Sequence, residues 1–193
     1  MRIVRLSVRL TLGALIALGP TSAGFSQSIE EKAEICSACH GENGVPADPK
    51  IPAIWGQYEG YLYIELRDFK SGLRKNEQMN PVAESLEKAD MKELAHYFAQ
   101  KPWPNLQQKR ANDADALHAQ QVASSAQCSQ CHLGGFLGAG TTPRIAGQNH
   151  DYLLKTMQEF RSGDRANSDW MTALLQKFTP DDLADMAKYL SGL

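Results

Sequence analysis

A five-residue pattern, Cys-x-x-Cys-His, occurs twice in this chain. Cys36-Ser37-Ala38-Cys39-His40 returns 92 residues later as Cys128-Ser129-Gln130-Cys131-His132. Two cysteines three positions apart can each form a thioether to one edge of a haem, and the histidine that follows them then lies under the iron. All four cysteines of the chain belong to these two motifs. The pattern predicts two covalently bound haem c groups, with Cys36, Cys39, Cys128 and Cys131 as attachment sites and His40 and His132 as iron ligands.

Three other uses of paired cysteines fit the sequence less well. A zinc ribbon brings its two pairs close together in the sequence, whereas 88 residues lie between Cys39 and Cys128. A redox-active dithiol is typical of a βαβ unit, which the helical pattern of this chain does not provide. Structural disulfides stay as an alternative in an oxidising compartment, but they do not account for a histidine after each pair.

The repetition extends beyond the cysteine motifs. Pro52-Ala53-Ile54-Trp55-Gly56-Gln57 is matched by Pro143-Arg144-Ile145-Ala146-Gly147-Gln148, and Phe69-Lys70-Ser71-Gly72 is matched by Phe160-Arg161-Ser162-Gly163. The matches follow the same order in both halves, at offsets of 91 or 92 residues. Such self-similarity indicates two domains that arose by duplication.

These matches divide the chain into four parts. We predict a signal peptide over 1–28, an N-terminal haem domain over 29–100, a linker over 101–112 and a C-terminal haem domain over 113–193. The linker begins with Lys-Pro-Trp-Pro, and its two prolines stop a helix and stiffen the connection.

The first residues have the layout of a secretory signal. Arg2, Arg5 and Arg9 precede the apolar run 10–19, and 21–28 is rich in small residues. The apolar run is short for a membrane span, so an uncleaved anchor is the weaker alternative. We expect a mature protein that is exported to the periplasm and soluble.

Apolar side chains recur with helical spacing in both halves. Leu62, Leu66 and Phe69 lie at i, i+4 and i+7, and the same stripe returns 91 residues later. No strand-like alternation competes with this pattern, so we predict an all-α fold of two tandem domains, each a small helical bundle around a covalently bound haem. So small a bundle has a thin core, which a buried haem would help to fill.

Each half ends in a further amphipathic helix with recognisable start signals. Asp90 and Glu93 have the spacing of a capping box, and Thr179-Pro180 puts a cap before a proline in the first turn.

The repeat also selects a second axial ligand for each iron. Met79 and Met171 align with each other, and each lies 39 residues after the histidine of its motif. Met91, Met157 and Met186 each align with a leucine at helical core spacing, so we interpret them as packing residues. We predict that Met79 and Met171 lie in irregular stretches between helices and bind iron through sulfur, which favours the ferrous state.

Other repeated residues suit the surroundings of a haem. The carbonyls of Pro52 and Pro143 are expected to accept from the second nitrogen of each motif histidine and so orient its ring. Three further pairs either donate to anionic haem propionates or pack at helix starts, and both interpretations stay open. These pairs are Gln57 and Gln148, Tyr61 and Tyr152, and Arg74 and Arg165.

Charge excludes one class of partner. The whole chain carries a formal net charge of −2. Residues 29–100 carry 8 basic and 13 acidic side chains, whereas 101–193 carry 9 of each. The sequence therefore lacks the excess of basic residues that would indicate a nucleic-acid partner.

Taken together, these motifs resemble the di-haem cytochrome c4 family of class I cytochromes c. The resemblance runs through nearly all of 29–193, with two departures: Trp55 stands where a small residue is usual, and Leu133 follows the second motif in place of a glycine. It implies two tandem cytochrome c-type domains, an N-terminal cytochrome c domain over 29–100 and a C-terminal cytochrome c domain over 113–193, each with a His/Met-ligated haem. It also implies a periplasmic shuttle whose redox partners are a donor such as a quinol–cytochrome c reductase and an acceptor such as a terminal oxidase. Such a shuttle is soluble but docks on membrane complexes.

A six-coordinate iron has no vacant site for substrate, and no nucleophile–base pair is apparent. The sequence therefore favours a one-electron carrier in a respiratory chain over an enzyme. One alternative is the haem electron-transfer subunit of a flavocytochrome or sulfur-oxidising dehydrogenase complex. Another is a haem enzyme in which one methionine is displaced to admit a small ligand.

Overall fold

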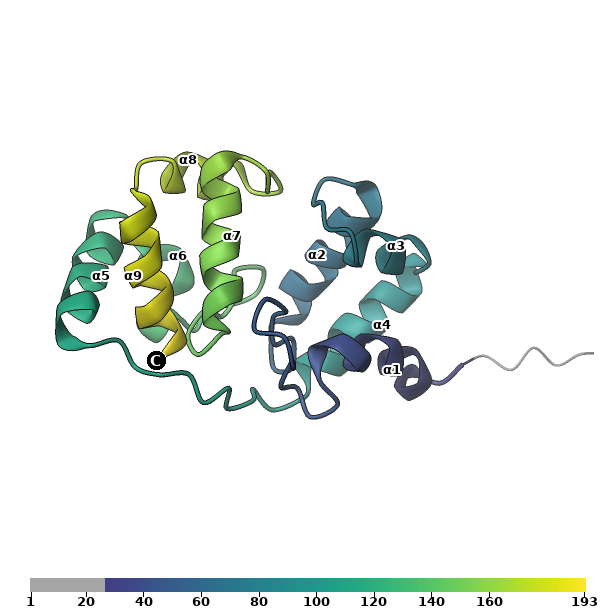
Figure 1. The fold of residues 1–193 in the computed structure, drawn as a ribbon. Helices are drawn as coiled ribbons and strands as arrows, with labels where there is room; N and C mark the ends of the chain where they lie inside the picture. The colour runs from purple at the N-terminus through teal and green to yellow at the C-terminus, as the bar shows by residue number, and fades with distance from the viewer. Residues whose placement is uncertain (1–26) are drawn as a thin grey trace, which may run out of the picture.

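A computed structural model describes residues 27–193, and Figure 1 shows two groups of helices joined by an extended connection. The predicted signal peptide lies outside the described residues apart from its last two positions. Among the helices of 27–193, none is long and apolar enough to cross a membrane.

Four helices form the N-terminal domain. They are α1 (Ile29–His40), α2 (Glu59–Ser71), α3 (Met79–Glu84) and α4 (Lys88–Ala99). Helix α4 packs against both α1 and α2, and α3 packs against α2. Apolar side chains from α1, α2 and α4 meet in a small buried cluster.

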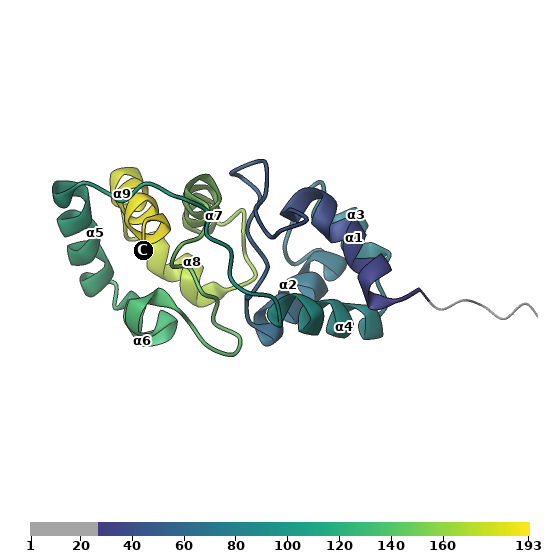
Figure 2. The same ribbon diagram turned by 90° about the horizontal axis from the view of Figure 1, so that it is seen from below.

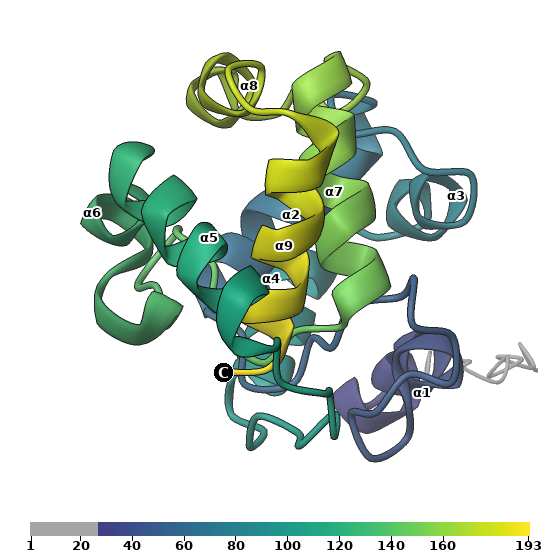
Figure 3. The same cartoon turned by 60° about the vertical axis from the view of Figure 1, so that its left-hand side comes forward.

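The C-terminal domain has the same arrangement, except that its first helix is divided into two. Helix α9 lies between α5 and α7 (Figure 3), and α8 packs against α7. No strand occurs in 27–193, and the two tandem helical domains confirm the predicted all-α fold. The elements are α5 (Asp113–Ser125), α6 (Cys128–His132), the 3-10 helix η1 (Gly134–Phe136), α7 (His150–Ser162), α8 (Asp169–Leu175) and α9 (Pro180–Ser191).

The repeated Phe-basic-Ser-Gly segments are helix stops. Gly72 ends α2 with φ of 75° and Gly163 ends α7 with φ of 86°, left-handed conformations that glycine adopts without a Cβ clash. In each case the glycine N–H donates to the carbonyl of the repeated phenylalanine. The chain then turns back, and this reversal brings the repeated arginine over the phenylalanine ring.

The helix starts show one success and one error of the sequence reasoning. Thr179 caps α9 and Asp182 completes the capping box, with Pro180 at the first position, as predicted. Helix α4, however, starts three residues earlier than expected, with Glu87 as the cap and Asp90 as its reciprocal partner. The Asp90 carboxylate accepts from the Glu87 N–H at 2.9 Å, so Asp90 lies inside the first turn of the helix and does not precede it.

The two domains meet through the repeated Pro-x-Ile-x-Gly-Gln segments. The Gln57 side chain donates to the Arg144 carbonyl and accepts from the Arg144 N–H, both at 2.9 Å. Gln148 makes the same two bonds with Ala53, also at 2.9 Å. Each glutamine thus serves the backbone of the other domain, an exchange typical of a two-fold interface. The two glutamines are therefore interface residues in this structure, and their amides are already satisfied.

Residues 100–112 connect the domains without a helix and run along one side of both (Figures 1 and 2). The Arg144 guanidinium lies 4.6 Å from the centre of the Trp103 ring. This cation–π contact holds the start of the connection against the same segment that Gln57 binds.

The backbone after each Cys-x-x-Cys-His motif differs between the domains. Helix α1 runs unbroken through its motif to Gly41, which has φ of 91°. In the second domain Gln127, with φ of 53°, separates α5 from α6, and Leu133 then takes φ of 59° and ψ of −179°. That region is almost restricted to glycine, so Leu133 stores backbone strain where Gly41 stores none.

We expect Leu133→Gly to stabilise the protein by about 1 kcal/mol because the strained leucine conformation is relieved. The measurement is the free energy of unfolding in urea. Gly41→Ala should instead destabilise the protein, since its Cβ would clash with the Val45 carbonyl oxygen. A Leu133→Gly protein that is less stable than the parent would contradict the assignment of strain.

A histidine joins α5 to α9. His118 Nδ1 lies 2.8 Å from Asp185 and its Nε2 lies 3.1 Å from Asp182. The bond to Asp185, reinforced by Asp182, raises the pKa of His118 above its ordinary value. The imidazole is half-exposed, so solvent weakens the pair without removing it.

Because the folded pKa of His118 is raised, its stabilising effect is complete below the ordinary pKa of about 6.5 and is lost as the pH rises through the folded value. We therefore expect the thermal midpoint to fall between about pH 6 and pH 8. In His118→Gln this fall becomes shallower. His96→Gln in the other domain is the matched control, and an identical slope in both variants would exclude the contribution of His118.

Candidate haem-binding sites

The two motif histidines are buried and held in the same way. His40 Nδ1 lies 2.8 Å from the Pro52 carbonyl oxygen, and His132 Nδ1 lies 3.0 Å from that of Pro143. A carbonyl can only accept, so Nδ1 carries the proton and donates. The Nε2 lone pair of each ring is then the one available to a metal. The predicted proline carbonyl contacts are confirmed in both domains.

Burial also sets the charge state of these rings. Both histidines are 7% exposed. Burial lowers the pKa of His40 and of His132, and the bond to the proline carbonyl opposes that shift only in part. A neutral imidazole is the form that binds iron.

The cysteines of each motif differ in exposure. Cys36 and Cys128 are half-buried against the apolar cluster of their own domain, whereas Cys39 and Cys131 are exposed. Burial, together with the nearby Cys39, raises the pKa of Cys36 to about 11. A redox-active dithiol requires a lowered pKa, so this environment does not suit that alternative. It suits a thioether, which carries no charge.

The candidate methionines lie on short helices and not in the irregular stretches that we predicted. Met79 is the first residue of α3, and Met171 is in the first turn of α8. The N–H of Met79 donates to the Asn76 side chain at 2.9 Å, and the N–H of Met171 donates to Ser168 at 3.4 Å. In each case a polar side chain three positions before the methionine binds an N–H group of the first helical turn, an effect that the apolar periodicity could not reveal.

The candidate cysteines and methionines differ in whether they contact the apolar cluster of their own domain. In the C-terminal domain Cys128 and Met171 both pack, half-buried, against one cluster. In the N-terminal domain Cys36 joins the cluster, while Met79 is half-buried outside it. The buried part of that N-terminal cluster is small and consists of Ala33, Leu62, Leu94, Ala95 and Phe98.

The residues present fit a haem. A domain with so few fully buried apolar side chains gains stability from a large flat apolar group beside them. Thiols for attachment and a neutral imidazole with a free Nε2 occur together in each domain, and a thioether is available from Met79 or Met171. Histidine with methionine is a donor set that haem iron accepts.

A cluster of charged residues between the domains was missed by the sequence reasoning. Glu65, 8% exposed, binds Arg74 of its own domain at 2.5 Å and Arg165 of the other at 2.7 Å. Glu65 and Asp68 lie on the buried face of α2 beside Leu62, where carboxylates are unusual. An acid within the apolar stripe was the signal that could have revealed the cluster.

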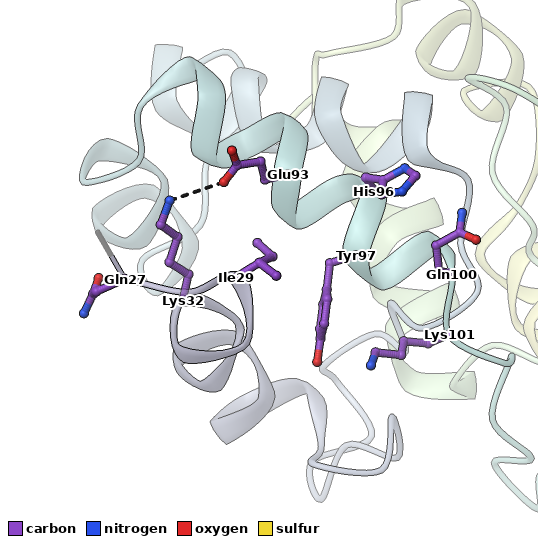
Figure 4. A pocket seen from close by; sticks show the side chains of 8 residues that line it. All are labelled: Gln27, Ile29, Lys32, Glu93, His96, Tyr97, Gln100 and Lys101. Atoms are coloured by element: carbon purple, nitrogen blue, oxygen red, sulfur yellow. Dashed lines mark hydrogen bonds and ion pairs between the residues drawn. The ribbon is translucent and has the colours of Figure 1, made fainter. Parts of the chain in front are cut away.

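A groove on the N-terminal domain lies elsewhere. It is formed where α1 and α4 cross, and Figure 4 shows Tyr97 beside Lys101 within it. None of the eight candidate residues lines it, so the groove is separate from the candidate haem sites. Its lining residues are Gln27, Ile29, Lys32, Glu93, His96, Tyr97, Gln100 and Lys101.

Comparisons with known proteins match both halves of the chain to one family. Residues 32–102 and 116–193 match the family described as Cytochrome c. Cytochrome c4 of Pseudomonas aeruginosa is 30% identical over 201 residues, which cover 96% of this chain and 98% of that protein. The thiosulfate dehydrogenase electron acceptor of Thiomonas intermedia is 31% identical, over 81% of this chain and 75% of its own length.

A solved structure has the same fold. Reduced recombinant cytochrome c4 from Pseudomonas stutzeri aligns with a TM-score of 0.76 and 27% identity, covering 86% of this chain and 96% of its own. Two matched domains and similarity to a cytochrome c4 along nearly the whole length show that the chain belongs to the cytochrome c family, as a di-haem electron-transfer cytochrome of the c4 type with two covalently bound haem c groups.

Proposed function

We propose that the eight candidate residues hold the two haems in equivalent ways. Cys36 and Cys39 attach the first haem, and His40 and Met79 bind its iron. Cys128, Cys131, His132 and Met171 do the same for the second. The observation that carries this assignment is the pair of bonds from His40 and His132 to proline carbonyls, at 2.8 and 3.0 Å, because they leave Nε2 free at the same position of each repeat.

The protein in this proposal is a periplasmic one-electron carrier of a respiratory chain. Each haem supplies a metal that takes up and releases a single electron. The histidine and the methionine would together hold each iron and would leave it no vacant site for a substrate. Burial of the imidazoles and their fixed hydrogen bonds keep the ligands in place in both oxidation states, which keeps rearrangement small.

We further propose that the carrier accepts electrons from a donor such as a quinol–cytochrome c reductase and delivers them to a terminal oxidase. Similarity to a thiosulfate dehydrogenase electron acceptor favours a second candidate, in which a sulfur-oxidising dehydrogenase is the donor. The family likeness fits both roles, because either enzyme would transfer single electrons to the same haems.

Axial ligation is tested by exchanging the sulfur ligand. We expect Met79→His and Met171→His each to lower one of the two reduction potentials, because a thioether favours the ferrous state more than an imidazole does. Each variant should also lose about half of the weak near-infrared absorption of methionine bound to ferric iron. Met91→Leu and Met186→Leu are the controls, and a lowered potential in either would show that the wrong methionines were chosen.

The donor is tested by rapid mixing. The oxidised protein is mixed with a reduced quinol–cytochrome c reductase or with thiosulfate dehydrogenase and its substrate, and haem reduction is followed by absorbance. For a respiratory shuttle we expect fast reduction by the first and at least about tenfold slower reduction by the second, because complementary charge at the correct interface raises the association rate. The reverse order would favour the sulfur-oxidising role.

A further inference from the structure

The charged cluster between the domains starts from a symmetric exchange. Arg74 donates to the Tyr152 hydroxyl of the other domain at 3.2 Å, and Arg165 donates to the Tyr61 hydroxyl at 3.3 Å. The two arginines and the two tyrosines are equivalent residues of the repeat. Each guanidinium is fixed over a phenylalanine ring of its own domain, at 4.5 Å for Arg74 and 4.4 Å for Arg165.

One side chain breaks this symmetry. Glu65 accepts from both arginines, at 2.5 and 2.7 Å, and from Asn167 at 3.1 Å. Its equivalent in the other domain, 91 residues later, is Thr156. The cluster therefore contains a matched pair of cations and an unmatched anion that the N-terminal domain alone supplies.

The unmatched anion is charged at neutral pH. Burial alone would raise the pKa of Glu65, but Arg74 and Arg165 outweigh it and the pKa lies below the ordinary value. A second acid of α2, Asp68, is also buried and is bound by Arg67 and Asn167. The residue equivalent to Asp68 is Glu159, which turns outward to Lys155. Buried negative charge thus lies on α2 and not on α7.

Helix α2 connects this charge to the N-terminal domain. Leu62 and Phe69, which flank Glu65 on the buried face of α2, belong to that domain, and Leu62 is part of its apolar cluster. Glu65 is bonded to the C-terminal domain through the side chains of Arg165 and Asn167. A carboxylate stabilises the ferric form of a nearby haem, because that form carries one more positive charge.

We propose that Glu65 is a positioning residue that makes the two haems unequal, by holding both interdomain arginines and lowering the reduction potential of the N-terminal haem relative to the C-terminal one. This inference rests on the proposed carrier function. When one electron is shared, it passes from the N-terminal haem, which is oxidised, to the C-terminal haem, which is reduced. The direction of internal transfer then depends on the charge of Glu65.

The test is a spectroscopic redox titration of Glu65→Gln, which keeps the shape of the side chain and removes its charge. We expect the equilibrium constant for passing one electron from the N-terminal to the C-terminal haem to fall about tenfold, which is 59 mV for a one-electron step. Met79→His and Met171→His identify which potential belongs to which domain. Glu159→Gln removes the same charge from a partly exposed ion pair and should change the constant less than twofold.

Two further variants separate tuning from structural support. Glu65→Asp keeps the charge and should restore most of the difference. The double variant Glu65→Gln with Thr156→Glu moves the carboxylate to the equivalent half-buried position of α7 and should shift the difference toward a lower C-terminal potential.

Several results would overturn the proposal. They are equal potentials in the parent protein, a change below twofold in Glu65→Gln, an equal change in Glu159→Gln, or loss of either haem from Glu65→Gln. A parent protein that does not contain two redox-active haems would instead overturn the carrier function itself.

Discussion

A hydrogen bond in each domain joins the imidazole of the proposed iron ligand to the segment that contacts the other domain. The carbonyl of Pro52 accepts from His40, and the residues that follow Pro52 form the contact with the other domain through Ala53 and Gln57. The same six-residue segment therefore orients an imidazole and docks a neighbour. A displacement of either domain would be felt at the histidine ring, because the peptide units between them are bonded at both ends.

The duplication gives this interface its form. Equivalent glutamines exchange bonds with the backbone of the opposite domain, and equivalent arginines exchange bonds with tyrosines. Such reciprocity is what two identical subunits would achieve around a two-fold axis. Because both copies now lie in one chain, each position is free to change alone, and Glu65 opposite Thr156 is such a change.

The domains have also diverged in backbone. The N-terminal motif lies at the end of a continuous helix, whereas the C-terminal motif lies on a short helix set apart by left-handed Gln127 and Leu133. The C-terminal apolar cluster is also the larger of the two. A larger core tolerates a strained turn more easily, because its burial energy offsets the local cost.

The sequence by itself determined the number of haems, the helical class and the order of the elements, because each depends on a local pattern. The Cys-x-x-Cys-His motifs give the haems, apolar residues at i, i+4 and i+7 give the helices, and residues such as Gly72 and Thr179 mark helix ends and starts. It also selected Met79 and Met171, because duplication supplied an internal comparison. Only the tertiary structure decided that Gln57 and Gln148 bind backbone, that both methionines lie in the first turn of a short helix, and that Glu65 joins Arg74 to Arg165. The glutamine bonds and the bond from Arg165 to Glu65 join residues 87 to 100 positions apart, and the helix starts depend on competition between polar partners that the apolar pattern does not record.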